Sequence, residues 1–427
     1  MSGDTSFPES NLTAGIASAE LIANPASWIN RRVETVELLS QEQTRRRVSI
    51  DFTLSDGHIE ELTTPEGVVV PISVLTKEPR RNFDLRDESG SAVPVLGKES
   101  NAGLAHIAVM SAVLDVLPDD VPSEAFELVW SDLRQVVSSP PEAADEALGV
   151  FVGSAETDDT LRSAIWGNAT CRSLLDALRS NYVLFAVVPP EGPRRRILKY
   201  SYSEDFDVGV SGTLRERLAP WMLGQRLSRP DRSRFRILYP GAWRAASFHA
   251  EIVIPEDLRI EAAILYDFAK DEALSEPDLN RNRASLYASD TLDAEASTDA
   301  YVVIAPERRG RTVQAAATGL VVAALLWLGV NSGLDAQNPD AAVSLLLAGA
   351  ALYSGITAGR GEHVLVTKLF SSSRRLLGVV SLAALAASAA LAMQVPNAHP
   401  TGVWRVAAIA CTLAAGRLLW SAIRAPG

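Results

Sequence analysis

The sequence predicts an α+β protein: an antiparallel, β-rich cytoplasmic domain with a helical insertion, followed by a four-helix transmembrane bundle. Three observations predict this fold class. Charged residues are concentrated in the first 305 residues, and long uncharged apolar runs appear only after residue 311. The first part alternates in strand fashion, without the strand–helix–strand rhythm of a doubly wound sheet. A chain of 427 residues is long enough for two or three units.

The charge balance separates the two parts of the chain. The whole chain has 40 Lys and Arg against 52 Asp and Glu, a net charge of −12. From Pro306 onward there are 10 basic and 4 acidic residues, so the first 305 residues hold 30 against 48 and carry −18. An acidic domain lacks the basic face that displaces phosphate counterions, so we expect no nucleic-acid partner. The two cysteines, Cys171 and Cys411, exclude a disulfide scaffold.

The first strands follow an N-terminal segment of weak pattern. Residues 1–30 are rich in Ser, Asn, Ala and Pro, and we expect them to form a loose lead before a cytoplasmic α+β domain over 31–305. Apolar and polar residues alternate over 48–54 with the period of a half-buried strand. A more continuous apolar run follows at 68–75. The stretch 83–95 is typical of a hairpin with a Gly-containing turn.

Helical spacing replaces strand alternation between about residues 100 and 181, which predicts the helical insertion. Strand patterns resume at 182–188 and 196–202, and the turn-forming residues between them predict a hairpin. A short helix is expected over 214–223. Five further strand stretches complete the domain, at 235–239, 247–254, 260–266, 284–287 and 300–304.

Four apolar segments make up the predicted transmembrane domain over 312–427. They lie at about 312–334, 341–359, 376–395 and 403–423, each long enough to cross a bilayer as a helix. The fourth contains Arg405 and Arg417, which could each reach a different membrane interface. Small residues at four-residue spacing, such as Ala315, Gly319 and Ala323, favour close helix packing.

The loops between these segments predict the orientation. Loops rich in Lys and Arg alternate with loops that have none, and the positive-inside rule places the basic ones in the cytoplasm. No secretory signal precedes the acidic domain. We therefore expect a multi-pass protein of the cell (plasma) membrane, with the N-terminal domain and the C-terminus in the cytoplasm.

No metal, cofactor or catalytic motif is recognisable, so we expect no cofactor and assign no catalytic residue. Two places are candidate binding or docking sites. Alternation puts His249 and Glu251 on one strand face, as a pH-sensitive or ligand-facing pair or as a purely structural histidine. Arg360, Glu362 and His363 follow the second apolar segment, where they could dock the domain or an anionic headgroup, or form a local turn.

Several short motifs are spread along most of the chain. They are Arg45-Arg46-Arg47-Val48-Ser49-Ile50-Asp51-Phe52, Pro71-Ile72, Asn82-Phe83-Asp84-Leu85-Arg86-Asp87, Ser247-Phe248-His249-Ala250-Glu251 with Pro255, Leu286-Tyr287 and Gly361-Glu362-His363. In these motifs the chain resembles a family of uncharacterised multi-pass membrane proteins from high-GC Gram-positive (actinobacterial-type) bacteria, with Phe248 in place of an expected Tyr. The resemblance implies a cytoplasmic domain on a multi-pass anchor and supplies no activity or catalytic residue.

The expected function is that of a multi-pass membrane protein whose cytoplasmic domain binds a ligand or takes part in signalling. Two alternatives stay open. One is a membrane effector or channel gated by the cytoplasmic domain, and the other is a membrane-bound hydrolase with an unrecognised site. The expected partners are the lipid bilayer and, through the cytoplasmic domain, a second copy of the chain or another protein. Binding is expected in preference to enzymatic activity.

Overall fold

The structure, a computed structural model, describes most of the chain. The described residues are 9–39, 43–78, 80–118, 121–156, 160–205, 233–256, 258–267, 270, 272–275, 277–288, 298–306, 311–331, 348–351, 353, 371–392 and 400–423. The short helix expected over 214–223 and most of the second apolar segment lie outside these residues.

The largest sheet has seven strands in the order β12-β13-β9-β1-β2-β7-β5. These strands are β1 (Ile29–Leu38), β2 (Gln43–Thr53), β5 (Arg81–Arg86), β7 (Arg195–Asp205), β9 (Phe248–Val253), β12 (Asp278–Asn280) and β13 (Arg283–Ala288). Neighbouring strands pair antiparallel except β1 and β9, which run parallel. The sheet is therefore antiparallel-rich, as the strand patterns predict, with β1 and β9 as its one parallel pair among the described strands.

Two smaller sheets cover one face of the large sheet. One has the order β11-β10-β14-β8 and the other the order β3-β4-β6. Their strands are β3 (Thr63–Thr64), β4 (Gly67–Thr76), β6 (Asn181–Val188), β8 (Ser233–Leu238), β10 (Leu258–Asp267), β11 (Glu272–Ser275) and β14 (Thr298–Pro306). The four-stranded sheet encloses one apolar core with β1, β9 and β13, and the three-stranded sheet encloses a second core with β2 and β7.

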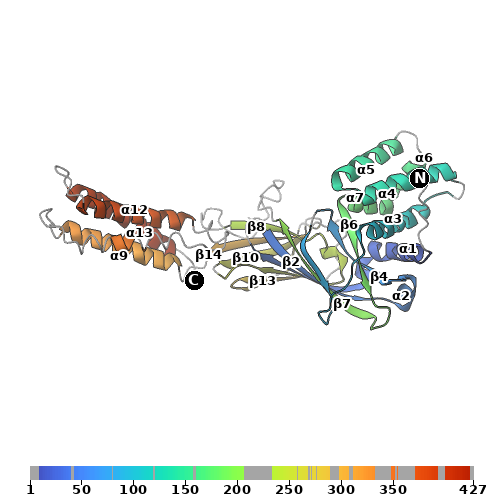
Figure 1. The fold of residues 1–427 in the computed structure, drawn as a ribbon, viewed down its shortest axis with the longest axis horizontal. Coiled ribbons are helices and arrows are strands. Elements are labelled where there is room, and N and C mark those ends of the chain that lie inside the picture. The colour runs from blue at the N-terminus through green and yellow to red at the C-terminus, as the bar shows by residue number, and fades with distance from the viewer. Residues whose placement is uncertain are drawn as a thin grey trace.

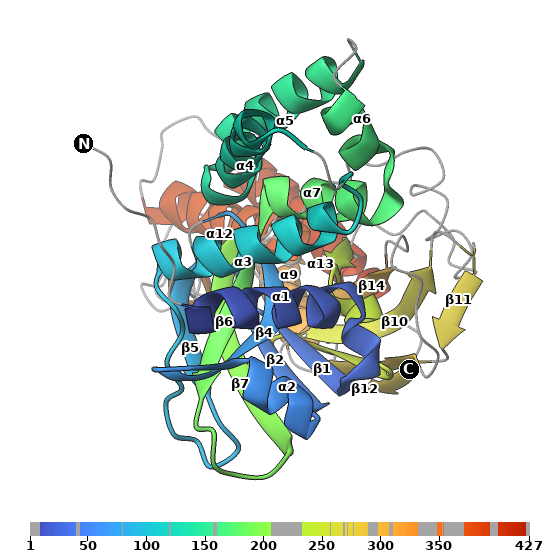
Figure 2. The same ribbon diagram turned by 90° about the vertical axis from the view of Figure 1, so that its right-hand side faces the viewer.

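Helices cover the outer face of the three-stranded sheet (Figure 2). They are α1 (Glu9–Ala23), α3 (Lys98–Leu114), α4 (Ser123–Ser138), α5 (Pro141–Glu156), α6 (Thr160–Gly167) and α7 (Ala169–Ser180). The side chains of Val183, Phe185 and Val187 enter the core under these helices, while Leu184, Ala186 and Val188 face the large sheet. Strand β6 is therefore buried on both faces. The helices α3 to α7 occupy the stretch where helical spacing predicts helices.

The N-terminal segment differs from the expected loose lead. Residues of α1 are part of the helical core, with Ala14 and Ile22 buried. After η1 (Pro25–Ser27), the indole of Trp28 is buried and donates to the carbonyl oxygen of Leu21 at 2.8 Å. The stretch is rich in Ser and Ala, and its small apolar side chains recur at four-residue spacing. This is enough for α1 to pack as a helix, because α3 provides the surface against which it packs.

The hairpin predicted over residues 182–202 is wrong. Strand β6 pairs with β4, whereas β7 pairs with β2 and β5, so the two strands belong to different sheets. The turn predicted after residue 85 is present: Asp87 accepts from Gly90 and Ser91, and Gly90 adopts a φ of 87°. Beyond that turn, the pairing continues as a bridge between Arg86 and Ala92, and Val95 then bridges to Ala186 of β6.

The predicted four-helix transmembrane bundle is wrong. Within the described part of the chain, two helices are long and apolar enough to cross a membrane: Val313–Asn331 in α9 (Arg311–Asn331) and Gly402–Trp420 in α13 (Pro400–Ile423). A core helix of a soluble protein can have the same length and apolar composition. Helix α12 (Ser371–Ala392) is not one of the two.

The helices α9, α12 and α13 pack on one another at the end of the molecule away from α3 to α7 (Figure 1). The small residues predicted to face each other do so: Ala323, Ala387 and Cys411 are buried in their common core. A hydrogen bond of 3.0 Å from the indole nitrogen of Trp327 to Oγ1 of Thr412 also joins α9 to α13. Close packing of small residues is therefore the basis of this bundle.

Candidate functional site

A cavity of about 500 Å³ lies where the helical layer meets the three-stranded sheet. It is formed by the start of α3, the end of α4 and the adjoining ends of β4 and β6, elements that Figure 2 shows stacked on one another. Its lining residues are Lys77, Glu78, Lys98, Asn101, Ala102, Ala105, Val137, Ser138, Ser139, Pro140, Tyr182 and Val183. Two of the five lysines of the chain therefore face one cavity.

Lys77 is held at the cavity by the end of β4. Its backbone N–H donates to the carbonyl oxygen of Ser180 at 2.8 Å, and its ammonium group donates to the carbonyl oxygen of Val136 at 2.9 Å. The side chain is half-buried. Burial lowers the pKa of Lys77 to about 8, with a further lowering by Lys98 and an opposing contribution from Asp145. At neutral pH the ammonium is mostly protonated and has two further N–H bonds to offer.

The start of α3 adds to the positive character of the cavity. Lys98 is the first residue of the helix, and the preceding Gly97 has no side chain that could cap it. The first intrahelical bond runs from the N–H of Asn101 to the carbonyl oxygen of Gly97. The N–H groups of the first turn have no partner inside the helix and carry the positive end of its dipole. Oδ1 of Asn101 accepts from the N–H of Phe185 at 3.2 Å, which fixes the helix start against β6.

The lining combines charge with an apolar wall. Two ammonium groups and one carboxylate, that of Glu78, leave the cavity net positive in a domain of net charge −18. Alanine, valine and tyrosine side chains make up much of the remaining surface. Such a cavity suits a small molecule with an anionic group and an apolar body. Among the described residues, no group of three or more His, Cys, Asp or Glu is placed to hold a metal ion.

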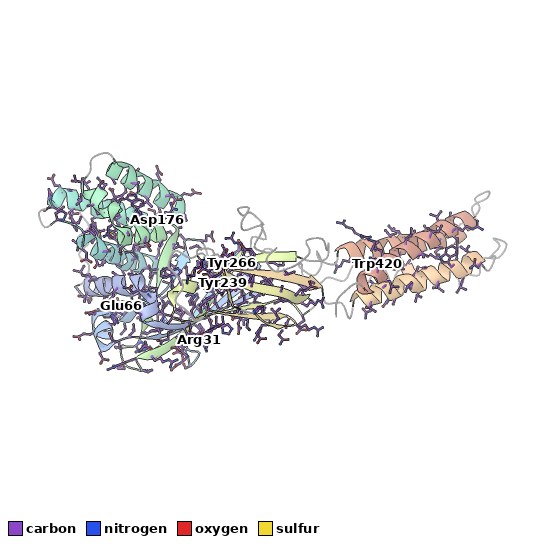
Figure 3. The ribbon with its side chains drawn as sticks, turned by 180° about the vertical axis from the view of Figure 1, so that it is seen from behind. Arg31, Glu66, Asp176, Tyr239, Tyr266 and Trp420 are labelled. Carbon is purple, nitrogen blue, oxygen red and sulfur yellow. The ribbon has the colours of Figure 1, made fainter. Side chains whose placement is uncertain are left out.

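His249 and Glu251 share a strand face, as their spacing predicts. Both lie on the half-buried face of β9 that points away from the two covering sheets. Nδ1 of His249 is 3.4 Å from Nη2 of Arg31, and Glu251 accepts from Oγ1 of Thr35 at 3.2 Å. Burial lowers the pKa of His249; Glu251 opposes this change and Arg31 adds to it. Figure 3 shows Arg31 on the strand-rich part, and neither His249 nor Glu251 lines the cavity.

The other three predicted site residues, Arg360, Glu362 and His363, lie outside the described residues. Sequence reasoning did not single out Lys77 or Lys98. The available signal was weak: one lysine ends an apolar strand stretch and the other begins a helical one, 21 positions later. No protein-family model matches the chain, and a search of curated proteins finds no match.

Proposed function

We propose that the protein is a membrane-associated binding protein whose β-rich domain takes a small amphipathic anion into the cavity beside α3. One observation carries this proposal: Lys77, Lys98 and the uncapped start of α3 converge on a cavity with an apolar wall. The anionic group would lie between the two ammonium groups, and the apolar body would lie against Ala102 and Val183.

The electrostatics of the cavity favour such a ligand. The half-buried ammonium group of Lys77 has a lowered pKa because burial removes water that would solvate its charge. An anion beside the ammonium group would replace the lost solvation with a direct electrostatic attraction. The N-terminus of a helix stabilises a neighbouring anion by a further 0.3–1 kcal/mol or so. Binding should therefore raise the pKa of Lys77 and depend on its charge.

A titration with hexanoate tests the proposal. Isothermal titration of the full-length protein in lipid nanodiscs should give saturable binding, and Lys77→Met should weaken it at least tenfold, on the order of 1.4 kcal/mol. Lys199→Met makes the same substitution at an exposed lysine of β7 and should leave the affinity unchanged. Equal affinities for the wild type and Lys77→Met, or no saturable heat, would contradict the proposal.

We also propose that α9 and α13 cross the plasma membrane, which makes the protein multi-pass, with the β-rich domain and the C-terminus in the cytoplasm. The length and composition of both helices support this proposal. Arg308, Arg309 and Arg311 precede the first span, and basic residues flanking a span favour the cytoplasmic side.

Cysteine labelling on either side of α9 tests the orientation. In a chain with Cys171→Ala and Cys411→Ala, a cysteine at Gln337 should react with an impermeant thiol reagent applied to intact cells. A cysteine at Glu307, on the other flank of the same helix, should react only after the cells are opened. Labelling of both positions, or of Glu307 alone, in intact cells would refute the proposed orientation.

A further inference from the structure

A buried network of charges lies between the two cores that the covering sheets enclose with the large sheet. Arg32 and Glu34 of β1 and Arg46 of β2 point to the covered face of the large sheet, the face on which Val36 and Ile50 are buried. Figure 3 shows the neighbouring Tyr239 in the middle of the strand-rich part, well away from the bundle that carries Trp420. The network fills the junction between the two covering sheets.

Ion pairs connect five side chains in a row, which are Arg32, Glu34, Arg46, Glu204 and Arg80. Nε of Arg32 donates to Glu34 at 3.1 Å, and Arg46 pairs with the other oxygen of Glu34. Nε of Arg46 donates to Glu204 at 2.9 Å, and Arg80 donates to the second oxygen of Glu204 at 2.8 Å. Both carboxylates are therefore fully used by three guanidinium groups.

A fourth arginine, Arg244, has no carboxylate partner among the described residues. Arg244, at the end of η2 (Ala242–Arg244), is 8% exposed and stacks on the ring of Trp243 at 4.8 Å. In the part of the chain that the structure describes, no acidic side chain pairs with it. Arg32 is 4% exposed, and its Nη2 donates to the hydroxyl of Tyr200 at 3.1 Å, but its Nη1 is buried with no hydrogen-bond partner.

The junction therefore holds more positive than negative charge. Among the described residues, Arg32, Arg46, Arg80 and Arg244 face only Glu34 and Glu204, an excess of two buried positive charges. An uncompensated buried charge costs several kcal/mol. Loss of a proton does not relieve the excess at neutral pH. Burial, followed by repulsion from Arg32, lowers the pKa of Arg244 only to about 9.

We propose that the junction binds a small inorganic anion of the size of chloride between Nη1 of Arg32 and the guanidinium of Arg244. The anion would satisfy the unpartnered donor and remove half of the charge excess. A small anion is indicated because the backbone of Gly241 lies directly against Arg32, where an added Cβ would be 2.9 Å from Cζ. This site lies on β1 and η2, apart from the lysine cavity, and does not depend on the function proposed for that cavity.

Thermal unfolding of the full-length protein in detergent tests this site. The unfolding temperature should rise with chloride concentration when isethionate keeps the ionic strength constant, because a ligand that binds only the folded state stabilises it. Arg244→Met should abolish this dependence. Arg45→Met, at an exposed arginine of β2, should retain it. Equal unfolding temperatures of the wild type in the two salts, or a chloride effect that persists in Arg244→Met, would overturn the proposal.

A second measurement uses only the wild-type protein. Crystals grown or soaked in bromide should show an anomalous-scattering peak between the guanidinium groups of Arg32 and Arg244. Bromide peaks at the protein surface with none at this position would overturn the proposal, whatever the folding of the variant.

Discussion

At the scale of single residues, Lys77 controls the charge of the cavity. Two neighbouring charged residues, Asp145 and Lys98, change the pKa of Lys77 in opposite directions, and each can be replaced by substitution. Asp145 raises the pKa of Lys77 and Lys98 lowers it, while burial is the largest influence and acts downward. A single substitution at Asp145 or Lys98 should therefore lower or raise the pKa of Lys77, and with it the charge of the cavity near physiological pH.

We predict that the pKa of Lys77 is about 8, that Asp145→Asn lowers it and that Lys98→Met raises it. NMR of lysines labelled by ¹³C reductive methylation would measure all three values in one protein, with the exposed Lys199 as an internal reference. A pKa of Lys77 that moves in the same direction in both variants would contradict the arrangement of charges around the cavity.

The lowered pKa of Lys77 predicts that the free energy of unfolding depends on pH. The folded-state pKa of Lys77 lies below its usual 10.5, so the unfolded chain binds more protons between about pH 8 and 10.5. This lysine therefore makes the free energy of unfolding rise with pH across that window, and below pH 8 it disfavours folding to a constant extent. Urea titrations at pH 8 and 10 should show a smaller rise for Lys77→Met than for the wild type or Lys199→Met.

Some residue-level features were accessible from the sequence and others were not. The alternation of β9 correctly placed His249 and Glu251 on one face, because a strand has a period of two. The same rule places Arg32 and Glu34 on the buried face with Val36 and Leu38, so buried charges were detectable there. The lysine cavity could not be detected from the sequence, because it forms only where α3 and α4 dock near the end of β4, and these elements are far apart in the chain.

At the scale of elements, β6 and β7 show why a local pattern can mislead. Two strands separated by a short turn usually pair, which is the basis of the hairpin prediction. However, residues 183–188 are all buried, whereas β7 has exposed or half-buried positions between its buried ones. A strand buried on both faces needs a layer on each side, and the helices supply the second layer only over β4 and β6. The two strands therefore separate into different sheets.

The contact between α9 and α13 depends on small residues at one point. An added Cβ on Gly319 would lie 3.1 Å from Cβ and 3.4 Å from Cα of Ala415. Because one of these atoms is backbone, a larger side chain at Gly319 must push the helices apart. Gly416, one position further along α13, has nothing within 4 Å of an added Cβ and is a matched control.

We predict that Gly319→Leu destabilises the helix bundle and Gly416→Leu does not. Overpacking of a close contact typically costs about 1–3 kcal/mol. The measurement is the unfolding temperature of the full-length protein in detergent, followed by tryptophan fluorescence, since Trp327 and Trp404 lie in the bundle. Equal unfolding temperatures for the two variants would mean that α9 and α13 do not approach each other at Gly319.

At the scale of the whole molecule, the apolar cores divide into two groups along the chain. The three cores of the β-rich domain draw their buried residues from between Ala14 and Ile304. The two cores of the helical bundle draw theirs from between Ala315 and Leu418. The boundary in the core therefore coincides with the change from acidic to apolar sequence near residue 306, which composition alone predicts.

This division predicts that the β-rich domain folds without the bundle. A chain ending at Pro306 keeps every buried residue of its three cores, and a domain of that size buries about three quarters of the surface of its unfolded chain. Expressed alone, it should remain in solution without detergent, give a mixed α and β circular dichroism spectrum and unfold cooperatively. A shorter chain ending at Asp267 removes β11, β12, β13 and β14, and with β14 the strand between β8 and β10, so it should fail to fold. If the longer chain aggregates while the full-length protein is stable in detergent, the bundle must contribute contacts that hold the β-rich domain together.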